Sequence, residues 1–435
     1  MAEYLTNTTD LTKVAAAIRE KGGTSDPLVY PDGFVTAIGN IQTGGGSAAG
    51  APGDITFYDY DGTIVTSWTL EELATKTALP DYPSHDGLVC QGWNWSLADL
   101  KTTNRRMNVG AMYITDDGKT RIYIRLEEGR TSPMLGVCPN GTVTVDWGDG
   151  TTPDTLTGTS TSTVQWTPNH AYAAPGDYVI KLTVNGTMGF YGAPSSDQYS
   201  AILRYSSGSD SRNYVYRNSV QKIEIGNGVT TIGNSAFSNC YSLASITIPN
   251  GVTTISTYAF NTCYSLASIT IPNGVTTIGN SAFNYCYSLA SITIPNGVTT
   301  ISTYAFNTCY SLASITIPNG VTTIGNYAFN YCYSLASITI PNGVTRISIY
   351  AFYNCYSLAS ITIPDGVTSI GKNAFNNCYS IAFYDFTALQ AVPTLGSSVF
   401  SGIPADCQIR VPASLVDTWK AATNWSTYAD HIMGV

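Results

Sequence analysis

The sequence predicts a mainly β protein, in which a repeat solenoid follows a β-sandwich and a small helical N-terminal module. Two observations predict this fold class. A 23-residue unit recurs with little change from Val229 to Pro364, and the residues before it carry short strand and turn patterns. A fixed period of this length is typical of stacked coils that bury their apolar faces against one another. The spacing is kept by Cys240, Cys263, Cys286, Cys309, Cys332, Cys355 and Cys378.

The composition limits the classes of partner. A chain of 435 residues is expected to hold two to four domains. It has 29 acidic and 20 basic side chains, a net charge of −9, so we expect no nucleic-acid partner. Arg346 is the only charged side chain between Val229 and Pro364. Long-range electrostatics are therefore not expected to steer a ligand to the coils.

The compartment is predicted from what the sequence lacks. No run of about 18 apolar residues occurs, so we expect no membrane insertion. The first residues, MAEYLTNTTDLTKVAAAIREKGG, lack the basic start and continuous apolar core of a secretory signal, which favours assembly in a bacterial cytoplasm. The repeat cysteines are expected to be buried free thiols, because side chains at one position of stacked coils point the same way.

Residues 1–41 predict two short amphipathic helices. Leu11, Val14 and Ile18 follow helical spacing in the first, and the second contains FVTAI. Such a pair cannot make a core alone, so we expect it to dock on a partner or on copies of itself. A disordered leader is the alternative. A Gly/Ser-rich linker, residues 42–53, follows.

Residues 54–110 predict a small α+β module. ITFYDYDGTIVTSWT has the pattern of a β-hairpin around Asp61-Gly62. LEELATKTALP predicts a short helix that Pro80 stops. Trp93 and Trp95 are expected to cover the core of this module, and an exposed aromatic patch is the alternative.

Residues 111–192 predict an all-β domain, and residues 193–219 a polar connector. MYITDDGKTRIYIRL alternates like a hairpin around Asp117-Gly118. GTVTVDWGDGT and HAYAAPGDYVIKLTV follow, and this pair resembles the two signatures of the PKD-type immunoglobulin-like domain. The resemblance implies a β-sandwich. It lies at Asp146, Trp147, Gly148, Asp149, Gly150, His170, Tyr172, Pro175, Gly176 and Tyr178.

Three aspartates of this domain could suggest a calcium site. They are Asp146, Asp149 and Asp154. Calcium takes six or more oxygen ligands, whereas aspartates beside glycines commonly hold a tight turn. We therefore predict that they shape the turn and that no metal binds.

One coil, from Leu289 onward, shows how the solenoid, residues 220–379, is expected to form. LxxIxI predicts a short parallel strand, and Asn296-Gly297 a tight turn that uses positive φ. VTTI predicts a second extended segment, and AFxxC one helical turn that points Phe and Cys inward. The pattern resembles the BspA-like leucine-rich repeat. Residues 380–435 leave the period and predict last strands with a helical C-terminal cap.

The sequence contains no catalytic constellation, so we expect neither an enzyme nor a cofactor. The three histidines are His85, His170 and His431, and none can pair with a repeat cysteine as a nucleophile. No acid lies between Ile225 and Pro364, so the coils lack the paired carboxylates of sugar-cleaving enzymes.

The coils are rich in tyrosine, and we predict that these side chains form a binding surface. Uncharged surfaces of this kind suit protein or glycan contact, because tyrosine supplies area and a hydroxyl at low entropic cost. The alternative, for the row after each repeat cysteine and for the other tyrosines alike, is that they only stabilise the stack. This first group contains Tyr241, Tyr264, Tyr287, Tyr310, Tyr333 and Tyr356, and continues at Tyr379. The other groups are Tyr258, Tyr304, Tyr327 and Tyr350 before the AF dipeptide, and Tyr285 and Tyr331 after it.

The N-terminal third carries a second resemblance. TxxTDLTxVAxAIRxKGGTS, followed by FYDYDGT and GLVxQGWNWxLAD, resembles tail-associated structural proteins of phages and prophages. This implies a virion adhesin that docks on tail proteins through residues 1–41. Because many phage fibres are trimers, the resemblance also implies that the chain associates with copies of itself through these residues. Its solenoid would bind a host-surface protein or glycan. The alternatives are a secreted BspA-like adhesin of the bacterial cell surface and a virion protein with a purely structural role.

Overall fold

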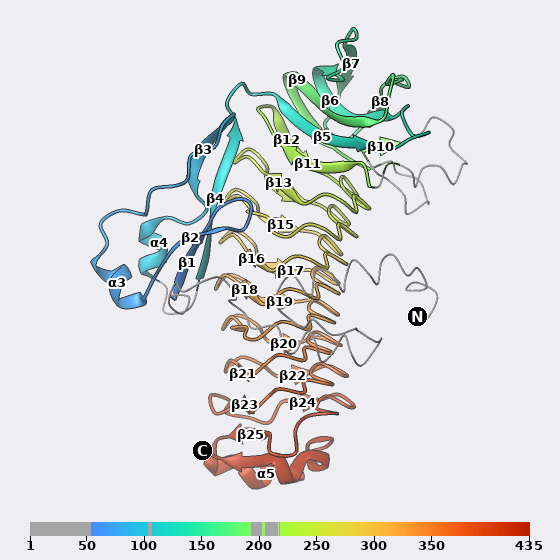
Figure 1. Cartoon of the computed structure of the whole chain (residues 1–435). Coiled ribbons are helices and arrows are strands. Elements are labelled where there is room, and N and C mark those ends of the chain that lie inside the picture. The colour runs from blue at the N-terminus through green and yellow to red at the C-terminus, as the bar shows by residue number, and fades with distance from the viewer. Residues whose placement is uncertain (1–53, 103–106, 193–201, 205–215, 217) are drawn as a thin grey trace, which may run out of the picture.

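The computed structural model describes residues 54–102, 107–192, 202–204, 216 and 218–435. The predictions for 1–41, for 42–53 and for most of 193–219 lie outside these residues. The described chain is elongated: a stack of coils runs from a β-domain at one end to a helical cap at the other, and a small sheet lies along one side (Figure 1). The mainly β fold class with a repeat solenoid is confirmed.

The sheet along the side of the stack comes from the predicted α+β module. Its strands have the order β2-β1-β4-β3, and the β1–β2 hairpin turns at Gly62 as predicted. Trp93 and Trp95 are buried, so their predicted place in the core is confirmed. The elements are β1 (Ile55–Tyr58), β2 (Ile64–Trp68), α3 (Leu70–Thr75), β3 (Leu88–Trp93), α4 (Leu97–Lys101) and β4 (Met107–Thr115).

The β-domain is a sheet whose buried side chains form one continuous hydrophobic core with the coils. The first half of β6 pairs with β8 and β10, and its second half with β7 and β9. The predicted hairpin around Asp117-Gly118 is wrong: β4 pairs with β1 and β3, whereas β5 pairs with β9 and β11. β4 is buried along most of its length, which suits a central strand of the other sheet. The strands are β5 (Thr120–Leu126), β6 (Met134–Asp146), β7 (Asp154–Thr159), β8 (Gln165–Trp166), β9 (Gly176–Phe190), β10 (Leu203–Arg204) and β11 (Val220–Glu224).

The β-domain also closes the first end of the solenoid. β11 pairs with β5 on one side and with the coil strand β13 (Ser245–Thr247) on the other. β12 (Val229–Ile232) likewise pairs with both β9 and the coil strand β14 (Thr254–Ile255). The sheet hydrogen bonds therefore continue from the β-domain into the stack, and the first coil has no open apolar end.

Most coils contribute two short strands to two parallel columns, but residues 268–270 and 337–339 form no strand, so these two coils contribute to the second column alone. Pairing joins residues 23 apart, as in Ile301 with Ile324 and Ile292 with Ile315, so equivalent side chains lie above one another. The first column adds β16 (Ser291–Thr293), β18 (Ser314–Thr316) and β21 (Ser360–Thr362). The second adds β15 (Thr277–Ile278), β17 (Thr300–Ile301), β19 (Thr323–Ile324), β20 (Arg346–Ile347), β22 (Ser369–Ile370) and β24 (Thr394–Leu395).

The interior of the stack repeats with the same register. The Phe rings of neighbouring coils are stacked, for example Phe283 on Phe306 with centroids 5.5 Å apart. The prediction of buried free cysteines is confirmed, and Cys309 donates its thiol to the Phe283 carbonyl at 3.2 Å. Burial raises the pKa of the Cys240 thiol to about 12, so the thiols of this column are neutral.

Two turn predictions are wrong. AFxxC is not a helical turn: residues before Ala and before Cys are left-handed, such as Tyr304 (φ 57) and Thr308 (φ 62). This conformation lets alternate amides leave the coil, and the Phe306 amide donates to the Ala328 carbonyl of the next coil at 2.9 Å. The Asn296-Gly297 turn, closed by the Val298 amide on the Pro295 carbonyl, has no positive φ, as in a type I turn.

The last coil is covered by the predicted cap. Trp419 and Trp425 are fully buried against Phe386, with ring centroids 5.2 and 5.4 Å away. Among the residues that the structure describes, no helix has the length and apolar character needed to cross a membrane. The elements are β23 (Phe383–Asp385), β25 (Gln408–Val411), η2 (Ala413–Leu415), α5 (Val416–Ala421), η3 (Trp425–His431) and a strand that was not predicted, β26 (Ile432–Gly434).

The side sheet is fixed to the first strand column. The Asn108 side chain donates to Ser314 Oγ at 3.0 Å, its backbone amide donates to Thr316 Oγ1 at 3.2 Å, and Thr293 donates to its carbonyl. Ser268 Oγ donates to the Tyr60 carbonyl at 3.0 Å. Hydroxyl groups of several successive coils are therefore engaged within the protein.

Candidate binding surface

The tyrosines after each repeat cysteine form one continuous ladder. From Tyr241 to Tyr379 the neighbouring ring centroids lie 4.6 to 5.0 Å apart, and the inner rings are nearly parallel. Each inner ring therefore covers the faces of its neighbours, and a ligand can reach only edges and hydroxyls there. Burial raises the pKa of Tyr356 to about 12 and that of Tyr287 well above its usual value, so these hydroxyls stay protonated. This geometry favours the alternative that the row stabilises the stack.

A second, shorter ladder is built from three of the tyrosines before the AF dipeptide. Tyr304, Tyr327 and Tyr350 are stacked with centroids 4.7 Å apart. Tyr304, at one end of this ladder, is 37% exposed, and Tyr327 and Tyr350 are partly buried. Tyr258 is 46% exposed but is not brought into the ladder, because Ser281 occupies the same position of the next coil.

Tyrosines between the ladders join them. Tyr331 contacts Tyr333 of the first ladder edge to face, with centroids 5.8 Å apart. It also contacts Tyr353 at 5.7 Å, and Tyr353 contacts Tyr350 of the second ladder at 5.1 Å. We call this group the tyrosine patch: Tyr304, Tyr327, Tyr331, Tyr333, Tyr350 and Tyr353. In another coil, Tyr285 is 40% exposed and contacts Tyr287 at 6.1 Å.

Tyr353 is the member that sequence reasoning missed. It follows Phe352, whereas five other coils carry asparagine at this position, namely Asn261, Asn284, Asn307, Asn330 and Asn376. The substitution of an aromatic residue in one coil of a nearly identical series was the signal that could have found it. The patch depends on it, because Tyr353 contacts both Tyr331 and Tyr350.

The left-handed backbone conformation in the patch is a property of the repeated coil and does not depend on the tyrosine side chains. Tyr304, Tyr327, Tyr331 and Tyr350 all have φ between 55° and 59°. In other coils Ser281 or Asn373 stands at the position before Ala-Phe, and Thr308 or Asn354 at the position before Cys, all with left-handed φ, so the turn requires this conformation whichever side chain is present. The strain of about 1 kcal/mol or more per residue is therefore not evidence for a function of its own.

The aspartates of the β-domain have protein partners, as the turn interpretation predicts. Asp146 accepts from the Gly148 amide at 2.9 Å, and Asp154 accepts from Trp147 Nε1 at 2.8 Å. Asp149 contacts His170 Nε2 at 2.7 Å, and the His170 ring is stacked on Trp147 at 4.5 Å. The DWGDG segment and the segment that begins at His170 thus meet in one cluster of side chains, and this cluster gives His170 a structural role.

His85 has a structural environment in the side sheet. Its Nε2 lies 2.7 Å from an oxygen of the buried Asp59 carboxylate. Its ring contacts Tyr60 and Tyr113 edge to face, each at 5.0 Å. The Tyr113 hydroxyl donates to the Pro83 carbonyl at 2.9 Å, and burial raises its pKa well above its usual value. His85 and Asp59 therefore contribute to the packing of the side-sheet module, and they do not activate the Tyr113 hydroxyl.

The fold and the patch define a class: a stacked-coil repeat protein with an uncharged, tyrosine-bearing surface. Residues 211–336 and 322–420 match the family model of the BspA type leucine rich repeat region, in six copies. This repeat region is therefore of the BspA leucine-rich repeat type, as the sequence predicts. Repeats of this kind typically serve binding or structural roles.

Solved structures of similar proteins are bacterial leucine-rich repeat proteins. A T. pallidum leucine-rich repeat protein is 34% identical, over 36% of this chain and 74% of that one, with a TM-score of 0.35. A leucine-rich cell surface protein from Faecalibacterium prausnitzii A2-165 is 28% identical, over 51% and 65%, with a TM-score of 0.34. One from Eubacterium ventriosum is 25% identical, over 53% and 73%, with a TM-score of 0.30. The comparison with curated proteins gave no match.

Proposed function

We propose that this chain is a bacterial surface adhesin whose coils bind a protein or glycan on another cell through the tyrosine patch. The observation that carries the proposal is the contact network that runs from Tyr350 through Tyr353 and Tyr331 to Tyr333. It joins two aromatic ladders into one surface on a rigid stack. The F. prausnitzii protein is named a cell surface protein, and we propose the same location here.

The chemistry of the patch suits a neutral ligand surface. The ladder interiors offer ring edges and hydroxyls, while Tyr353 and the ladder ends offer more of their faces. The coils hold the rings in register before a ligand arrives, so little side-chain entropy is lost on binding. Specificity would come from shape and hydroxyl hydrogen bonds, because the patch itself carries no charge.

Binding of the full chain to intestinal epithelial cells and to immobilised mucin tests the proposal. The variant Tyr304→Ser, Tyr327→Ser, Tyr350→Asn introduces residues that other coils carry at this position with left-handed φ, namely Ser281 and Asn373, so its fold should persist. We expect at least about tenfold weaker binding, the effect of losing three aromatic contacts of about 0.5 kcal/mol or more each.

The matched control is Tyr82→Ser, which removes a 51% exposed tyrosine from the side-sheet module. Its affinity should stay within about twofold of the unchanged chain. Equal affinities of the triple variant and the control would refute the patch as the contact surface. Failure of the unchanged chain to bind either target would refute the adhesin role and leave a structural role.

A virion adhesin is the second candidate. It is favoured by the resemblance of the N-terminal pattern, TDLTxVAxAIR, and of the block GLVxQGWNWxLAD to phage tail-associated proteins. The proposed docking and trimer formation through residues 1–41 belong to this candidate. Mass spectrometry of purified phage particles and of washed cell envelopes from the source strain separates the two: enrichment in particles supports the virion, and enrichment in envelopes supports the surface adhesin.

A further inference from the structure

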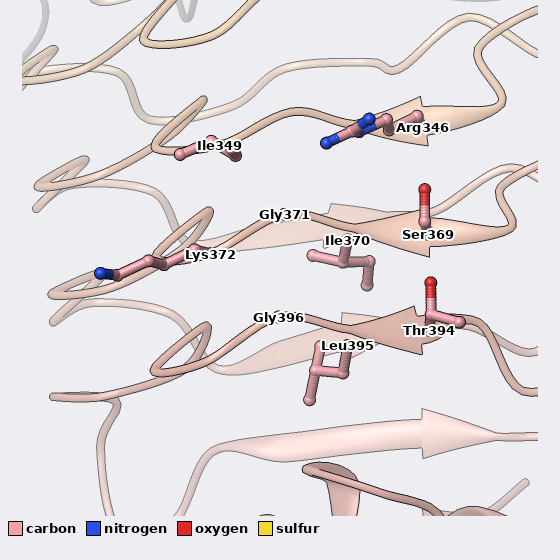
Figure 2. A pocket seen from close by; sticks show the side chains of 9 residues that line it. All are labelled: Arg346, Ile349, Ser369, Ile370, Gly371, Lys372, Thr394, Leu395 and Gly396. Carbon is pink, nitrogen blue, oxygen red and sulfur yellow. The ribbon is translucent and has the colours of Figure 1, made fainter.

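The second strand column contains a hollow of about 400 Å³ near the C-terminal end of the stack. Figure 2 shows Arg346 on β20 above Ser369 on β22 and Thr394 on β24, with Lys372 at the far end beyond Gly371. Ile370 and Leu395 also line the hollow. Ile370 and Leu395 are themselves buried in the core, and the partly exposed Ile349 is the apolar lining side chain that a ligand can reach. The site therefore has a cation at each end, two hydroxyls along one side and one accessible apolar side chain.

These two cations are a local departure from the repeat. From Val229 to Tyr379 the only charged side chains are Arg346, Asp365 and Lys372. Strand pairing places Arg346 in the column of Thr300 and Thr323, so a neutral residue suffices for the coil at this position. Coils that are otherwise nearly identical thus gained two positive charges that line the same hollow.

Both charges are available to a ligand. Arg346 and Lys372 are exposed, and among the described residues neither has an ion-pair partner. In Figure 2 the guanidinium group of Arg346 reaches along its strand toward the middle of the hollow. Elsewhere in the described chain, exposed Arg125 and Arg130 are paired with Asp177 and Glu127.

We propose that this hollow binds an acidic glycan, whose carboxylate or sulfate groups pair with Arg346 and Lys372. Lys372 is three residues beyond the strand partner of Arg346 and one coil away, which puts the two Cα atoms about 11 Å apart, and in Figure 2 the Lys372 side chain extends away from Arg346. That distance suits successive acidic groups on one chain. Ser369 and Thr394 can bond sugar hydroxyls, and the partly exposed Ile349 can contact the apolar face of a sugar ring.

The hollow borders the tyrosine patch without depending on it. Ile349 lines the hollow and is followed by Tyr350, the last ring of the shorter ladder. The Tyr350 amide donates to the Lys372 carbonyl at 3.0 Å, which fixes the two elements to each other. A glycan seated between the cations could thus extend toward the patch, while its acidic groups are recognised by the hollow alone.

The full chain immobilised on a sensor tests the inference, with dextran sulfate, polygalacturonate and neutral dextran as probes. We expect binding of at least one acidic polymer and none of dextran, and the stronger of the two identifies sulfate or carboxylate as the preferred group. The variant Arg346→Thr, Lys372→Asn restores residue types that other coils carry and should raise the Kd at least tenfold. It should also weaken the dependence on salt concentration.

The control, Arg130→Thr with Lys420→Asn, makes the same change in net charge at exposed positions outside the hollow, one of them the ion-paired Arg130, and should stay within twofold. Equal losses in the two double variants would overturn the inference, as would a wild-type chain that binds neither acidic polymer or binds single-stranded DNA more tightly. The triple tyrosine variant should keep its affinity for the acidic polymer. A result that refutes binding through the tyrosine patch can therefore be distinguished from one that refutes acidic-glycan binding in the hollow.

Discussion

A ladder of asparagine amides runs beside the Phe column and allows a worked prediction. The Asn284 amide donates to Asn261 Oδ1 at 2.9 Å, Asn307 donates to Asn284 Oδ1 at 2.6 Å, and Asn330 donates to Asn307 Oδ1 at 2.7 Å. The next coil has Tyr353 instead, and Asn330 Oδ1 is left without a hydrogen-bond partner although Asn330 is only 6% exposed. The ladder is thus continuous over four coils and ends at the tyrosine patch.

Asn307→Ala should lower the free energy of unfolding by about 2 to 4 kcal/mol. It removes two ladder hydrogen bonds of about 1 kcal/mol each, and it leaves the buried Asn330 amide without its remaining ladder partner, which adds a comparable or larger cost. Asn284 is less buried and can recover hydrogen bonds from water, which limits the loss on that side.

The matched control is Asn376→Ala, at the same position of a later coil. The Asn376 side chain donates one hydrogen bond of 3.2 Å, to Asn373 Oδ1 within its own coil, so we expect a loss of about 1 kcal/mol. Urea unfolding followed by circular dichroism and tyrosine fluorescence gives both midpoints and slopes. Losses that agree within about 0.5 kcal/mol would refute the idea that the amides act as a ladder between coils.

Three further predictions concern the coils. Of the ten cysteines only Cys90 is not buried, so a thiol reagent at pH 8 should modify one thiol rapidly and nine after unfolding; rapid modification of several would contradict the buried column. Thr308→Asn should raise the unfolding midpoint by an amount equivalent to about 1 kcal/mol, because Thr308 has a φ of 62° and asparagine adopts left-handed φ more readily. Asn354 and Asn377 already occupy this position in other coils. An unchanged or lower midpoint would contradict this prediction. Burial raises the pKa of Tyr356 to about 12 from about 10 in the unfolded chain, so the folded state favours the neutral phenol. That contribution is complete below pH 10 and is lost between pH 10 and 12, which a spectrophotometric titration of tyrosinate with parallel unfolding should detect; unfolding independent of pH in this window would contradict it.

The repeat itself could be predicted because the constant 23-residue spacing sets the register between neighbouring coils. The spacing of Cys240 to Cys378 sets the coil length, and Ile, Phe and Cys are buried where the pattern places them. The stacking of the tyrosines after Cys follows from that register too. Turn conformation could not be predicted, because Tyr304 and Thr308 are unusual residues for left-handed φ and only the neighbouring coil explains their amide directions.

Contacts between segments that lie far apart in the sequence could not be predicted either. Alternation along MYITDDGKTRIYIRL fits a hairpin as well as two strands of different sheets, and only the buried surface of the solenoid decides between them. The use of β5 and β9 to close the first coil is likewise a tertiary effect. Tyr353 and the pair of Arg346 and Lys372 acquire meaning only when stacking brings adjacent coils together.

Hydroxyl-radical footprinting of the full chain, free and bound to mucin, tests the central claim most directly. The account predicts that oxidation of Tyr304, Tyr331, Tyr350 and Tyr353 falls at least about threefold in the bound state, since these rings would lose contact with water. Oxidation of Tyr82, in the side-sheet module, should be unchanged. Protection of Tyr82 with an unprotected patch would contradict the assignment of the coils as the contact surface.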